Sequence, residues 1–459
     1  MSISDYSKSE LLYDLVVIGA GAGGLNAAFT AINYGKKVAL IERNQPGGEC
    51  TWSGCIPSKA MIQIAKEIKS SKKYGSIEIN SADVLSKVRD LIQKAHQAEA
   101  VPVLEDAGID YFYGEAVFLD KDTIQVGTNT LQTKNVMIAT GSSPVVPDIF
   151  GINTVDYLTN ENFFLLPNLP SSIIVLGAGA IGVELSQAMQ ALGVEVKLVE
   201  MAPHILYREE VELSKLLQEV LEKDGVDIFL NQRAIAISED STGIQLTLSS
   251  PKGETIVFAE KILLALGRQP NLTTLNIADI GIKATSRGIV VNDYCQTNVS
   301  HIYATGDVVG PYLFSHMAGY QARNVIHNLY GVGTQPIDLS GVAWCTFSDP
   351  EFARCGLTEV EASSEYNDIK IFMFDYKDLD RAVVDQKTIG KAKVICDNKG
   401  LILGASILGE RACELLGELQ LLKQNQIPLQ KLQESIHPYP GYSELLFYLS
   451  MDAKACFAA

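Results

Sequence analysis

Two glycine-rich segments with matching surroundings constrain the fold of this chain more than any other feature. Residues 19–24 read GAGAGG and residues 177–182 read GAGAIG, and each segment lies between a short apolar run and a helix-forming stretch. In both copies an acidic residue, Glu42 or Glu200, ends the next apolar run, 23 positions after the first glycine. One such turn is weak evidence, but two complete copies with the same offset predict two strand–turn–helix–strand units with parallel strands.

This pattern is the dinucleotide-binding fingerprint, in which glycines let the backbone approach a pyrophosphate and an acidic residue binds ribose hydroxyls. The predicted contacts are Gly19, Gly21, Gly24 and Glu42 in the first copy and Gly177, Gly179, Ile181, Gly182 and Glu200 in the second. The expected strands and helices are Leu15–Ile18, Leu25–Tyr34, Val38–Ile41, Ile173–Leu176, Val183–Leu192 and Val196–Val199. We therefore expect two bound dinucleotides.

Residues 47–59, GGECTWSGCIPSK, carry a cysteine pair beside the first fingerprint. Cys50 and Cys55 lie five positions apart, and Pro57 suits the first turn of a helix. At a helix N-terminus, with Lys59 nearby, the thiolate of Cys55 is favoured by the helix dipole and by the cation. The alternative is two unrelated cysteines in a loop, but the two flanking fingerprints favour a redox-active pair.

The composition limits the class of protein. The chain has 459 residues, enough for about three domains, and 47% of them are apolar, as is usual for a globular protein. A net charge of −17 argues against nucleic-acid partners and anionic membrane surfaces. No apolar run is long enough for a membrane span, no secretory signal is evident, and eight cysteines are too few for a secreted disulfide scaffold. A reducing, cytoplasmic location is expected.

Glu200 also bears on the choice of pyridine nucleotide. A carboxylate at this position accepts hydrogen bonds from a free 2′-hydroxyl group and repels a 2′-phosphate. Residues 201–206 contain no arginine that could pair with such a phosphate. The sequence therefore predicts that NADH is preferred over NADPH.

Further along the chain, three apolar runs end at glycine, as strands do where α/β sheets bind ligands. They are residues 136–139 before Thr140-Gly141, residues 262–266 before Gly267, and residues 302–304 before Thr305-Gly306-Asp307. From Val342 onward no phosphate turn occurs, and the pattern predicts strands at Phe372–Tyr376, Ala392–Cys396 and Leu401–Leu408 and a helix at Glu410–Gln424. This part is typical of an α+β association domain.

The ordered motifs of nearly the whole chain resemble those of the flavin-dependent pyridine nucleotide–disulfide oxidoreductases. This family includes dihydrolipoamide dehydrogenase, glutathione reductase and mercuric reductase. Besides the two fingerprints and residues 47–59, the motifs are ATGSSP at 139–144, GRQPN at 267–271, ATGDV at 304–308 and DPEFARCGLTE at 349–359. The resemblance implies an α/β protein with a discontinuous FAD domain (1–150 and 268–340), an NAD domain (151–267) and a C-terminal α+β dimerisation domain (341–459).

The resemblance also implies a role for individual residues. NAD(P)H would reduce FAD, FAD would reduce the Cys50–Cys55 disulfide, Cys55 would face the flavin as the charge-transfer thiolate, and Cys50 would exchange with the substrate. Lys59 and Glu184 would form an ion pair near the flavin. The implied FAD contacts are Gly19, Gly21, Gly24, Glu42, Gly48, Lys59, Ala116, Thr140, Gly141, Gly306, Asp307 and Ala318, and Gly267 joins the NAD contacts. No resident metal is expected, and the protein is expected to be a homodimer.

The C-terminal motif departs from that of the dithiol enzymes in the family. There the motif resembles HxHPTxxE, whose second histidine is the base for the outer thiol, whereas this chain reads His437-Pro-Tyr439-Pro-Gly441-Tyr-Ser-Glu444. Glu444 keeps its register, but Tyr439 stands at the base position, and a phenol has an ordinary pKa of about 10. His437 is a candidate substitute base, with a structural role as the favoured alternative. Tyrosine here resembles mercuric reductases and soluble transhydrogenases.

The sequence therefore predicts an FAD-dependent oxidoreductase that passes electrons from NADH to the Cys50–Cys55 pair and on to a disulfide-type acceptor, as dihydrolipoamide dehydrogenase does. The disulfide could belong to a small molecule or to a protein. Two alternative enzyme activities are the reduction of mercuric or other metal ions and soluble pyridine nucleotide transhydrogenation. An alternative of another class is a flavin-binding redox sensor with little turnover. Cys456, the single tail cysteine, is expected to be an ordinary thiol.

Overall fold

The computed structural model describes residues 11–76, 78–241 and 243–458. The chain divides into two compact units. The first unit comprises Met1–Pro57, Lys87–Val145 and Arg268–Ile337, and the second comprises Ser58–Ser86, Val146–Gly267 and Asp338–Ala459. A division into two units does not test the boundaries of the three domains expected from the sequence, which stay a prediction. In this division residues 58–86 belong to the second unit.

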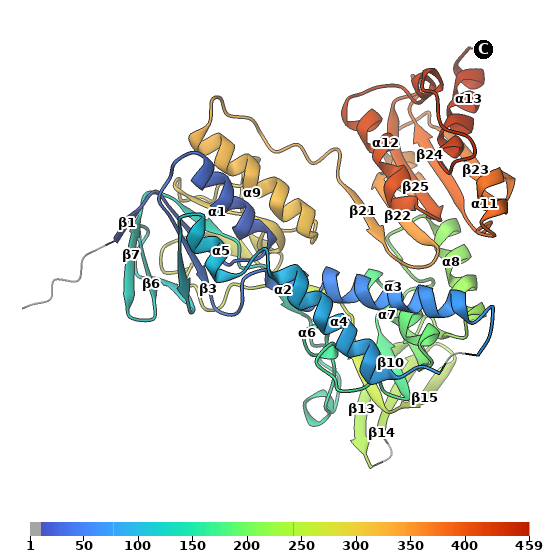
Figure 1. Ribbon diagram of the computed structural model, residues 1–459, viewed down its shortest axis with the longest axis horizontal. Helices are drawn as coiled ribbons and strands as arrows, with labels where there is room; N and C mark the ends of the chain where they lie inside the picture. Colours follow the sequence, from blue (N-terminus) through green and yellow to red (C-terminus); the bar gives the residue numbers. More distant parts are fainter. Residues whose placement is uncertain (1–10, 77, 242, 459) are drawn as a thin grey trace, which may run out of the picture. The chain divides into compact units, whose positions relative to one another are not determined.

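A parallel sheet with the strand order β20-β8-β2-β3-β4 forms the centre of the first unit. Its strands are β2 (Leu15–Ile18), β3 (Val38–Glu42), β4 (Ile109–Tyr113), β8 (Val136–Ile138) and β20 (Ile302–Ala304). Leu15 and Val17 pack into the hydrophobic cluster with helices α1 (Ala22–Asn33) and α9 (Ser315–Tyr330), which lie side by side (Figure 1). Val16 and Ile18 pack into a second cluster on the opposite face. This sheet is buried on both sides, as parallel sheets usually are.

The second face of this sheet is covered by a smaller sheet with the order β1-β7-β6-β5 and by apolar side chains from residues 275–308. Its strands are β1 (Leu11–Tyr13), β5 (Ala116–Phe118), β6 (Thr123–Val126) and β7 (Asn129–Thr133). The other elements of this unit are α2 (Gly48–Trp52), α5 (Val101–Asp106), β9 (Ser142–Pro144), β17 (Arg268–Pro270), β18 (Ala284–Thr285), β19 (Gly288–Ile289) and the 3₁₀ helix η2 (Gly306–Val308). Helices α3 (Cys55–Ser71) and α4 (Ser81–His96) each contribute residues to both units.

The second unit contains another parallel sheet, with the order β12-β11-β10-β16. Its strands are β10 (Ser172–Leu176), β11 (Glu195–Val199), β12 (Asp227–Phe229) and β16 (Lys261–Leu264), and α7 (Ala180–Ala191) connects β10 to β11. The antiparallel sheet β13 (Arg233–Asp240), β14 (Gly243–Ser250) and β15 (Gly253–Ala259) packs against one face through Ile244, Leu246 and Leu248. Nearby elements are η1 (Ile152–Thr154), α6 (Asn160–Phe163) and α8 (Val211–Lys223).

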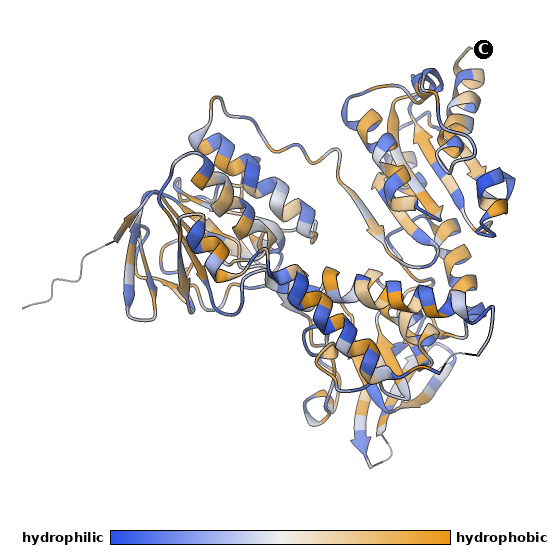
Figure 2. Ribbon diagram, viewed as in Figure 1, coloured by the Kyte–Doolittle hydropathy of each residue, from blue (hydrophilic) through white to orange (hydrophobic). Residues whose placement is uncertain are grey.

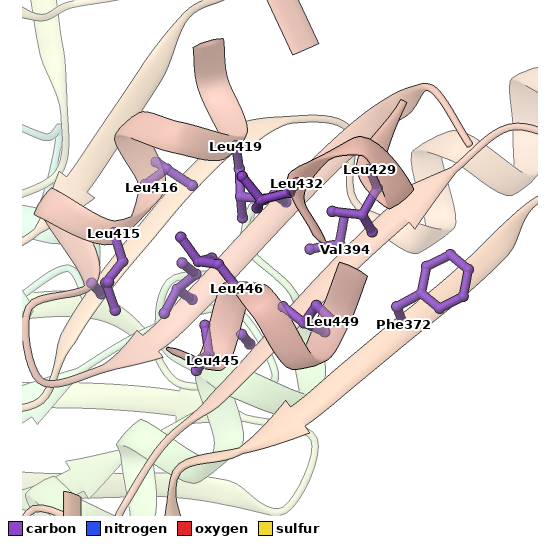
Figure 3. Close-up of a cluster of buried hydrophobic side chains, with 14 of the residues drawn as sticks. Phe372, Val394, Leu415, Leu416, Leu419, Leu429, Leu432, Leu445, Leu446 and Leu449 are labelled. Atoms are coloured by element: carbon purple, nitrogen blue, oxygen red, sulfur yellow. The ribbon is translucent and has the colours of Figure 1, made fainter. Parts of the chain in front are cut away.

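The C-terminal part of the second unit is an antiparallel sheet with the order β21-β22-β25-β24-β23. Its strands are β21 (Ala343–Thr346), β22 (Glu351–Gly356), β23 (Lys370–Asp375), β24 (Lys391–Cys396) and β25 (Ile402–Gly409). Leucines of α12 (Ala412–Gln424), η4 (Leu429–Glu434) and α13 (Glu444–Ala458) fill a core with Phe372 and Val394 (Figure 3). The strands of this sheet are largely hydrophobic in Figure 2. Short helices η3 (Tyr376–Asp378), α10 (Glu359–Glu365) and α11 (Asp380–Val384) complete it.

These observations confirm the fold class expected from the sequence, including the α+β character of the C-terminal part. The predicted strands lie within a residue or two of their observed bounds, but the helices of both fingerprints begin earlier than predicted. The apolar pattern first indicated a helix at Leu25, whereas α1 begins at Ala22, because Gly21 caps the helix and the glycine turn itself forms the first helical turn. Within the described residues, no helix has the length and apolar character that a membrane crossing requires.

Candidate active site

The first glycine turn depends on two backbone contacts that only glycine allows. Gly19 has a φ of +101°, and a Cβ built there would lie 2.3 Å from the carbonyl oxygen of Ala139 on the neighbouring strand segment. A Cβ at Gly24 would lie 1.7 Å from the carbonyl oxygen of Gly19. These contacts seat the start of α1 directly on the end of β2. Gly21, its N-cap, makes no side-chain capping bond, so the first amides of α1 can bind an anion such as a pyrophosphate.

Glu42 is fixed next to this turn by the backbone. Its carboxylate accepts hydrogen bonds from the amide of Ala20 at 2.8 Å and from the amide of Asn44 at 2.8 Å. The Ala20 bond ties the end of β3 to the glycine turn that follows β2. A carboxylate held in this place can accept hydrogen bonds from ribose hydroxyls without first having to be ordered.

The second turn repeats this arrangement contact by contact. Cβ atoms at Gly177 and Gly182 would lie 2.4 Å from the oxygen of Ala265 and 1.9 Å from the oxygen of Gly177. Glu200 accepts hydrogen bonds from the amides of Ala178 at 2.8 Å and Ala202 at 2.9 Å. Gly179 caps α7, and a Cβ there would meet nothing within 4 Å. This open space fits the prediction that the backbone at Gly179 approaches a dinucleotide. Ile181 lies in the first turn of α7, and Gly267, with a φ of +104°, follows β16.

Several other residues expected to bind FAD lie in the first unit, whereas Lys59, also expected there, belongs to the second. Thr140 donates from Oγ1 to the carbonyl of Asn271 at 2.9 Å, and Gly141 has a φ of +68°. The amide of Gly306 donates to Oε1 of Gln321 at 2.8 Å, and a Cβ at Gly306 would lie 2.9 Å from the Cβ of Ala318. Ala116 has its side chain in the hydrophobic cluster beneath the central sheet, so only its backbone can serve a ligand.

The segment that carries Cys50 and Cys55 contacts the first glycine turn. A Cβ at Gly48, whose φ is +60°, would lie 2.6 Å from the Cα of Gly21. Cys50 lies within the short helix α2, and Cys55 is the first residue of α3, as the sequence predicts. The helix dipole therefore favours a thiolate at Cys55. Glycine at position 48 is what allows the cysteine segment and the predicted flavin site to touch through their backbones.

The sulfur atoms of Cys50 and Cys55 share a partner at the start of another helix. The side chains of the two cysteines are hydrogen-bonded to each other, and Sγ of Cys55 lies 3.7 Å from Oγ of Ser315, the first residue of α9. The hydrogen bond to Cys55 and burial raise the pKa of the Cys50 thiol. This direction favours the proton on Cys50 rather than a thiolate there.

Arg268 connects four of the sequence motifs through one guanidinium group, and sequence reasoning did not assign it a role. It makes a bidentate ion pair with Glu49, the neighbour of Cys50, in which the Nη1–Oε1 distance is 2.6 Å. Its Nε donates to Oγ of Ser142 at 2.7 Å and lies 3.6 Å from Asp307. The Ser142 hydroxyl in turn donates to Asp307 at 2.5 Å. The available signal was the position of Arg268 inside GRQPN and of Glu49 beside a reactive cysteine.

In the second unit, Lys59 and Glu184 form the predicted ion pair, with an Nζ–Oε2 distance of 2.8 Å. The Glu184 side chain is only 5% exposed, and its other oxygen accepts the amide of Phe347 at 2.8 Å. The ammonium group of Lys59 also lies 4.7 Å from the centre of the Phe347 ring. Glu184 belongs to α7, the helix that begins at the second glycine turn. Whether this pair serves a flavin stays a prediction.

The C-terminal candidates are engaged in interactions that do not form a base for a thiol. The Tyr439 hydroxyl donates to Asp380 at 3.0 Å, and this bond raises the pKa of the phenol further. His437 is 6% exposed, and its Nε2 lies 3.1 Å from the carboxylate of Glu418. Its Nδ1 is buried and has no hydrogen-bond partner among the described residues. Glu444 accepts the amide of Gly441 at 3.2 Å and begins α13.

No resident metal was expected from the sequence. Among the residues that the structure describes, three or more His, Cys, Asp or Glu side chains are nowhere grouped so that they could hold a metal ion. The expectation stays a prediction.

Comparison with known proteins identifies relatives over nearly the whole chain. Residues 13–326 match the family model described as pyridine nucleotide-disulphide oxidoreductase, and residues 342–447 match its dimerisation domain. A mercuric reductase from Staphylococcus aureus is 32% identical over 442 residues, which cover 94% of this chain and 81% of that protein. A dihydrolipoyl dehydrogenase from Bacillus subtilis is 31% identical over 467 residues, covering 96% and 98%. The solved HOCl-induced flavoprotein disulfide reductase RclA from Escherichia coli superposes with a TM-score of 0.87 at 29% identity, covering 96% and 99%.

The Arg268 network leads to a prediction about stability. Replacing Arg268 with Gln leaves the carboxylates of Glu49 and Asp307 without their shared cation, and we expect the free energy of unfolding to fall by about 3 kcal/mol. The additional change Glu49→Gln removes one stranded charge and should recover part of the loss. Urea denaturation of the FAD-loaded protein compares both variants with the wild-type protein.

A matched control is Arg43→Gln. Arg43 lies 3.8 Å from Glu115, and both side chains are about half exposed, so its loss should change the unfolding free energy by at most about 0.5 kcal/mol. A loss in Arg268→Gln no larger than that of the control would contradict the role assigned to Arg268.

Proposed function

Because the chain belongs to the pyridine nucleotide-disulphide oxidoreductase family, we propose that it moves electrons from NADH through FAD to the Cys50–Cys55 pair, and that the acceptor is a soft metal ion rather than a disulfide. The sequence alone favoured a disulfide-type acceptor and left the metal ion as an alternative. The observation that carries the proposal is the state of Tyr439, which stands where a base would be needed and is bound to Asp380.

The family uses FAD and NAD(P)H, and the residues of this chain fit both groups. In the first unit, the uncapped start of α1, the fixed carboxylate of Glu42 and Asp307 would hold FAD. In the second unit, the start of α7 and Glu200 would hold the nicotinamide nucleotide. Bound FAD supplies two-electron transfer from the reduced nicotinamide to a disulfide.

After the flavin has reduced the disulfide, Cys50 and Cys55 have different roles. Cys55 begins α3 and accepts the hydrogen bond of Cys50, so it keeps the negative charge after the pair is reduced. Cys50 keeps the proton and must lose it before its sulfur can attack a disulfide or bind a metal ion. Reduction of a disulfide substrate therefore needs a group that takes this proton and later returns one to the leaving thiol.

The structure offers no such group among the C-terminal candidates. Tyr439 has an ordinary pKa of about 10, and its hydrogen bond to Asp380 raises that value. His437 is buried and directs Nε2 at Glu418. A soft metal ion does not need a base, because binding to the ion itself lowers the pKa of a thiol and releases its proton to solvent.

The names of the relatives are consistent with this acceptor class. Mercuric reductases are among the similar proteins, and one solved structure of RclA is described as a Cu(II) complex. For copper the step balances as follows. Two Cu(II) ions each take one electron and become Cu(I), the sulfur atoms of Cys50 and Cys55 join in an S–S bond, and the one proton of the Cys50 thiol leaves to solvent. The disulfide is then ready to be reduced again.

The proposal includes a homodimer. Residues 342–447 match a dimerisation domain, and apolar side chains on this part are unusually exposed, including Val384 at 71% and Ile436 at 100%. Such exposure is typical of a surface that another protein covers. The cytoplasmic location expected from the sequence stays a prediction.

The geometry of Glu200 predicts the preferred nucleotide. Because two amides fix its carboxylate at the end of β11, a 2′-phosphate would meet a negative charge that cannot move away. We expect kcat/KM for NADH to exceed that for NADPH by at least about tenfold, or about 1.4 kcal/mol. Glu200→Ala should reduce this ratio, and Glu195→Ala, at an exposed position on the same strand, should leave it unchanged. A wild-type preference for NADPH would overturn the assignment.

The acceptor is tested with a panel in which NADH is the donor and Cu(II), Hg(II), lipoamide, glutathione disulfide and thio-NAD are the acceptors. We expect the wild-type protein to reduce a metal ion with the highest kcat/KM. Tyr439→His restores an imidazole at the base position and should raise lipoamide reduction by about 100-fold, the smaller end of what general base catalysis contributes. Tyr74→His, at a tyrosine that is 91% exposed, is the matched control.

Other outcomes of the panel distinguish the alternatives. Efficient lipoamide or glutathione disulfide reduction by the wild-type protein would refute the metal-ion proposal and favour the dithiol function. Thio-NAD reduction that survives in Cys50→Ser would favour transhydrogenation. A protein that binds FAD but turns over none of the acceptors would favour a redox sensor.

A further inference from the structure

A row of aromatic and polar side chains crosses the C-terminal sheet on the face opposite its helices. Trp344 of β21 is paired with Arg354 of β22. Ser406 of β25 is paired with Arg354 on one side and with Lys393 of β24 on the other. The neighbours of these residues along the strands, such as Ala353, belong to the hydrophobic core with α12 and α13. Because side chains alternate between the two faces of a strand, the row lies on the other face.

Arg354 and Trp344 bind the end of the segment that follows Glu200. The Arg354 side chain is only 6% exposed, and its Nη1 donates to the carbonyl of Arg208 at 2.5 Å and lies 3.5 Å from Oε2 of Glu209. The indole Nε1 of Trp344 donates to Oε1 of the same carboxylate at 2.9 Å, and the guanidinium lies 5.0 Å from the centre of the indole ring. Both oxygens of Glu209 are therefore directed at one cross-strand pair.

The next residue along the chain is held by the same row. Glu210 accepts hydrogen bonds from Nζ of Lys393 at 2.9 Å and from the amide of Glu359 at 2.6 Å. The side chains of Lys393 and Glu210 are both 5% exposed. Removing one partner of a pair buried this deeply leaves an uncompensated charge, so the end of the segment is firmly fixed.

The other end of the segment contacts the second glycine turn. The amide of Leu206 donates to the carbonyl of Ala178, within that turn, at 2.8 Å, and the amide of Ala202 donates to Glu200. Leu206 has a φ of +46°, a strained conformation for leucine, so the segment needs contacts that hold it in place. The amide of Glu209 donates to the carbonyl of Leu206 at 2.8 Å. A chain of hydrogen bonds therefore runs from the C-terminal sheet to the glycine turn.

We propose that Arg354 and Trp344 are positioning residues for nucleotide binding, because through Glu209 they hold residues 202–209 against the second glycine turn. The inference rests on the function proposed above, in which this turn binds NADH. Loosening the segment would weaken one of the two amide contacts that fix Glu200. Affinity for the nucleotide should then fall. The rate of flavin reduction by bound NADH should not, because the contacts described here act on the segment and not on the cysteine pair.

The test measures binding and flavin reduction separately in the FAD-loaded full-length protein. Calorimetric titration with ADP-ribose, which has the pyrophosphate and adenosine ribose of NADH but no nicotinamide, gives an affinity that does not depend on turnover. Anaerobic stopped-flow reduction by NADH gives the limiting rate of flavin reduction. We expect Arg354→Gln to raise the Kd for ADP-ribose by about tenfold and to leave the limiting rate within about twofold of the wild-type value, as a lost binding contribution does.

A second variant removes a single contact. Trp344→Phe keeps an aromatic ring beside Arg354 and lacks only the donor to Glu209, so it should raise the Kd for ADP-ribose by about threefold, the effect of one hydrogen bond. This variant decides the matter if Arg354→Gln, which also loses an ion pair with Glu361, fails to fold. Bound FAD per chain should stay unchanged in both, because the predicted FAD contacts on the first glycine turn lie in the first unit.

Lys370→Gln is the matched control, because Lys370 lies on the edge strand β23 of the same sheet and pairs with Asp368 at 2.9 Å. It should leave both the Kd and the limiting rate unchanged. A wild-type protein that neither binds ADP-ribose nor is reduced by NADH would refute the proposed function, and this inference with it. ADP-ribose binding as tight in Arg354→Gln and Trp344→Phe as in the wild-type protein would overturn this inference alone. A lower limiting rate at an unchanged Kd would overturn it as well.

Discussion

The chemistry of the first unit depends on one backbone contact, that of Gly48 against Gly21. A single Cβ at position 48 would come within 2.6 Å of the Cα of Gly21, so no other residue allows the cysteine helix to rest on the phosphate turn. This contact brings the glycine turn, which is expected to hold a dinucleotide, next to the helix that carries Cys50. The start of α3 at Cys55 and the start of α9 at Ser315 then add helix ends around the sulfur atoms. Electron transfer needs this proximity, and glycine provides it.

The duplicated fingerprint explains how much of the fold could be predicted from the sequence. Strands such as Leu15–Ile18 and Ile173–Leu176 are continuous apolar runs because their sheets are buried on both faces, and this pattern is visible in a few residues. The glycine turns are equally local, since Gly19, Gly24, Gly177 and Gly182 each approach a carbonyl oxygen within the turn or on the adjacent strand segment. Glu42 and Glu200 follow from the same unit, because each accepts the amide that comes after the first glycine.

The parts that could not be predicted are contacts between segments far apart in the sequence. Arg268 meets Glu49 because separate motifs fold onto one another, and no local periodicity records which side chain is the partner. The environment of Tyr439 could not be predicted from the sequence either, because its partner Asp380 is distant along the chain. The sequence showed that a phenol replaced an imidazole, whereas the hydrogen bond to Asp380 that raises its pKa required the structure. Local pattern therefore predicts where the cofactors bind, whereas the choice of acceptor depends on tertiary contacts.

The central claim is that the thiolate of Cys55 receives the reducing equivalents beside the flavin. Anaerobic titration with NADH, followed by absorbance, tests this most directly when the wild-type protein is compared with Cys50→Ser and Cys55→Ser. The account predicts a long-wavelength band from a thiolate against the flavin in the wild-type protein and in Cys50→Ser, and no such band in Cys55→Ser. A band that persists in Cys55→Ser, or a purified protein that binds no flavin even after reconstitution, would contradict it.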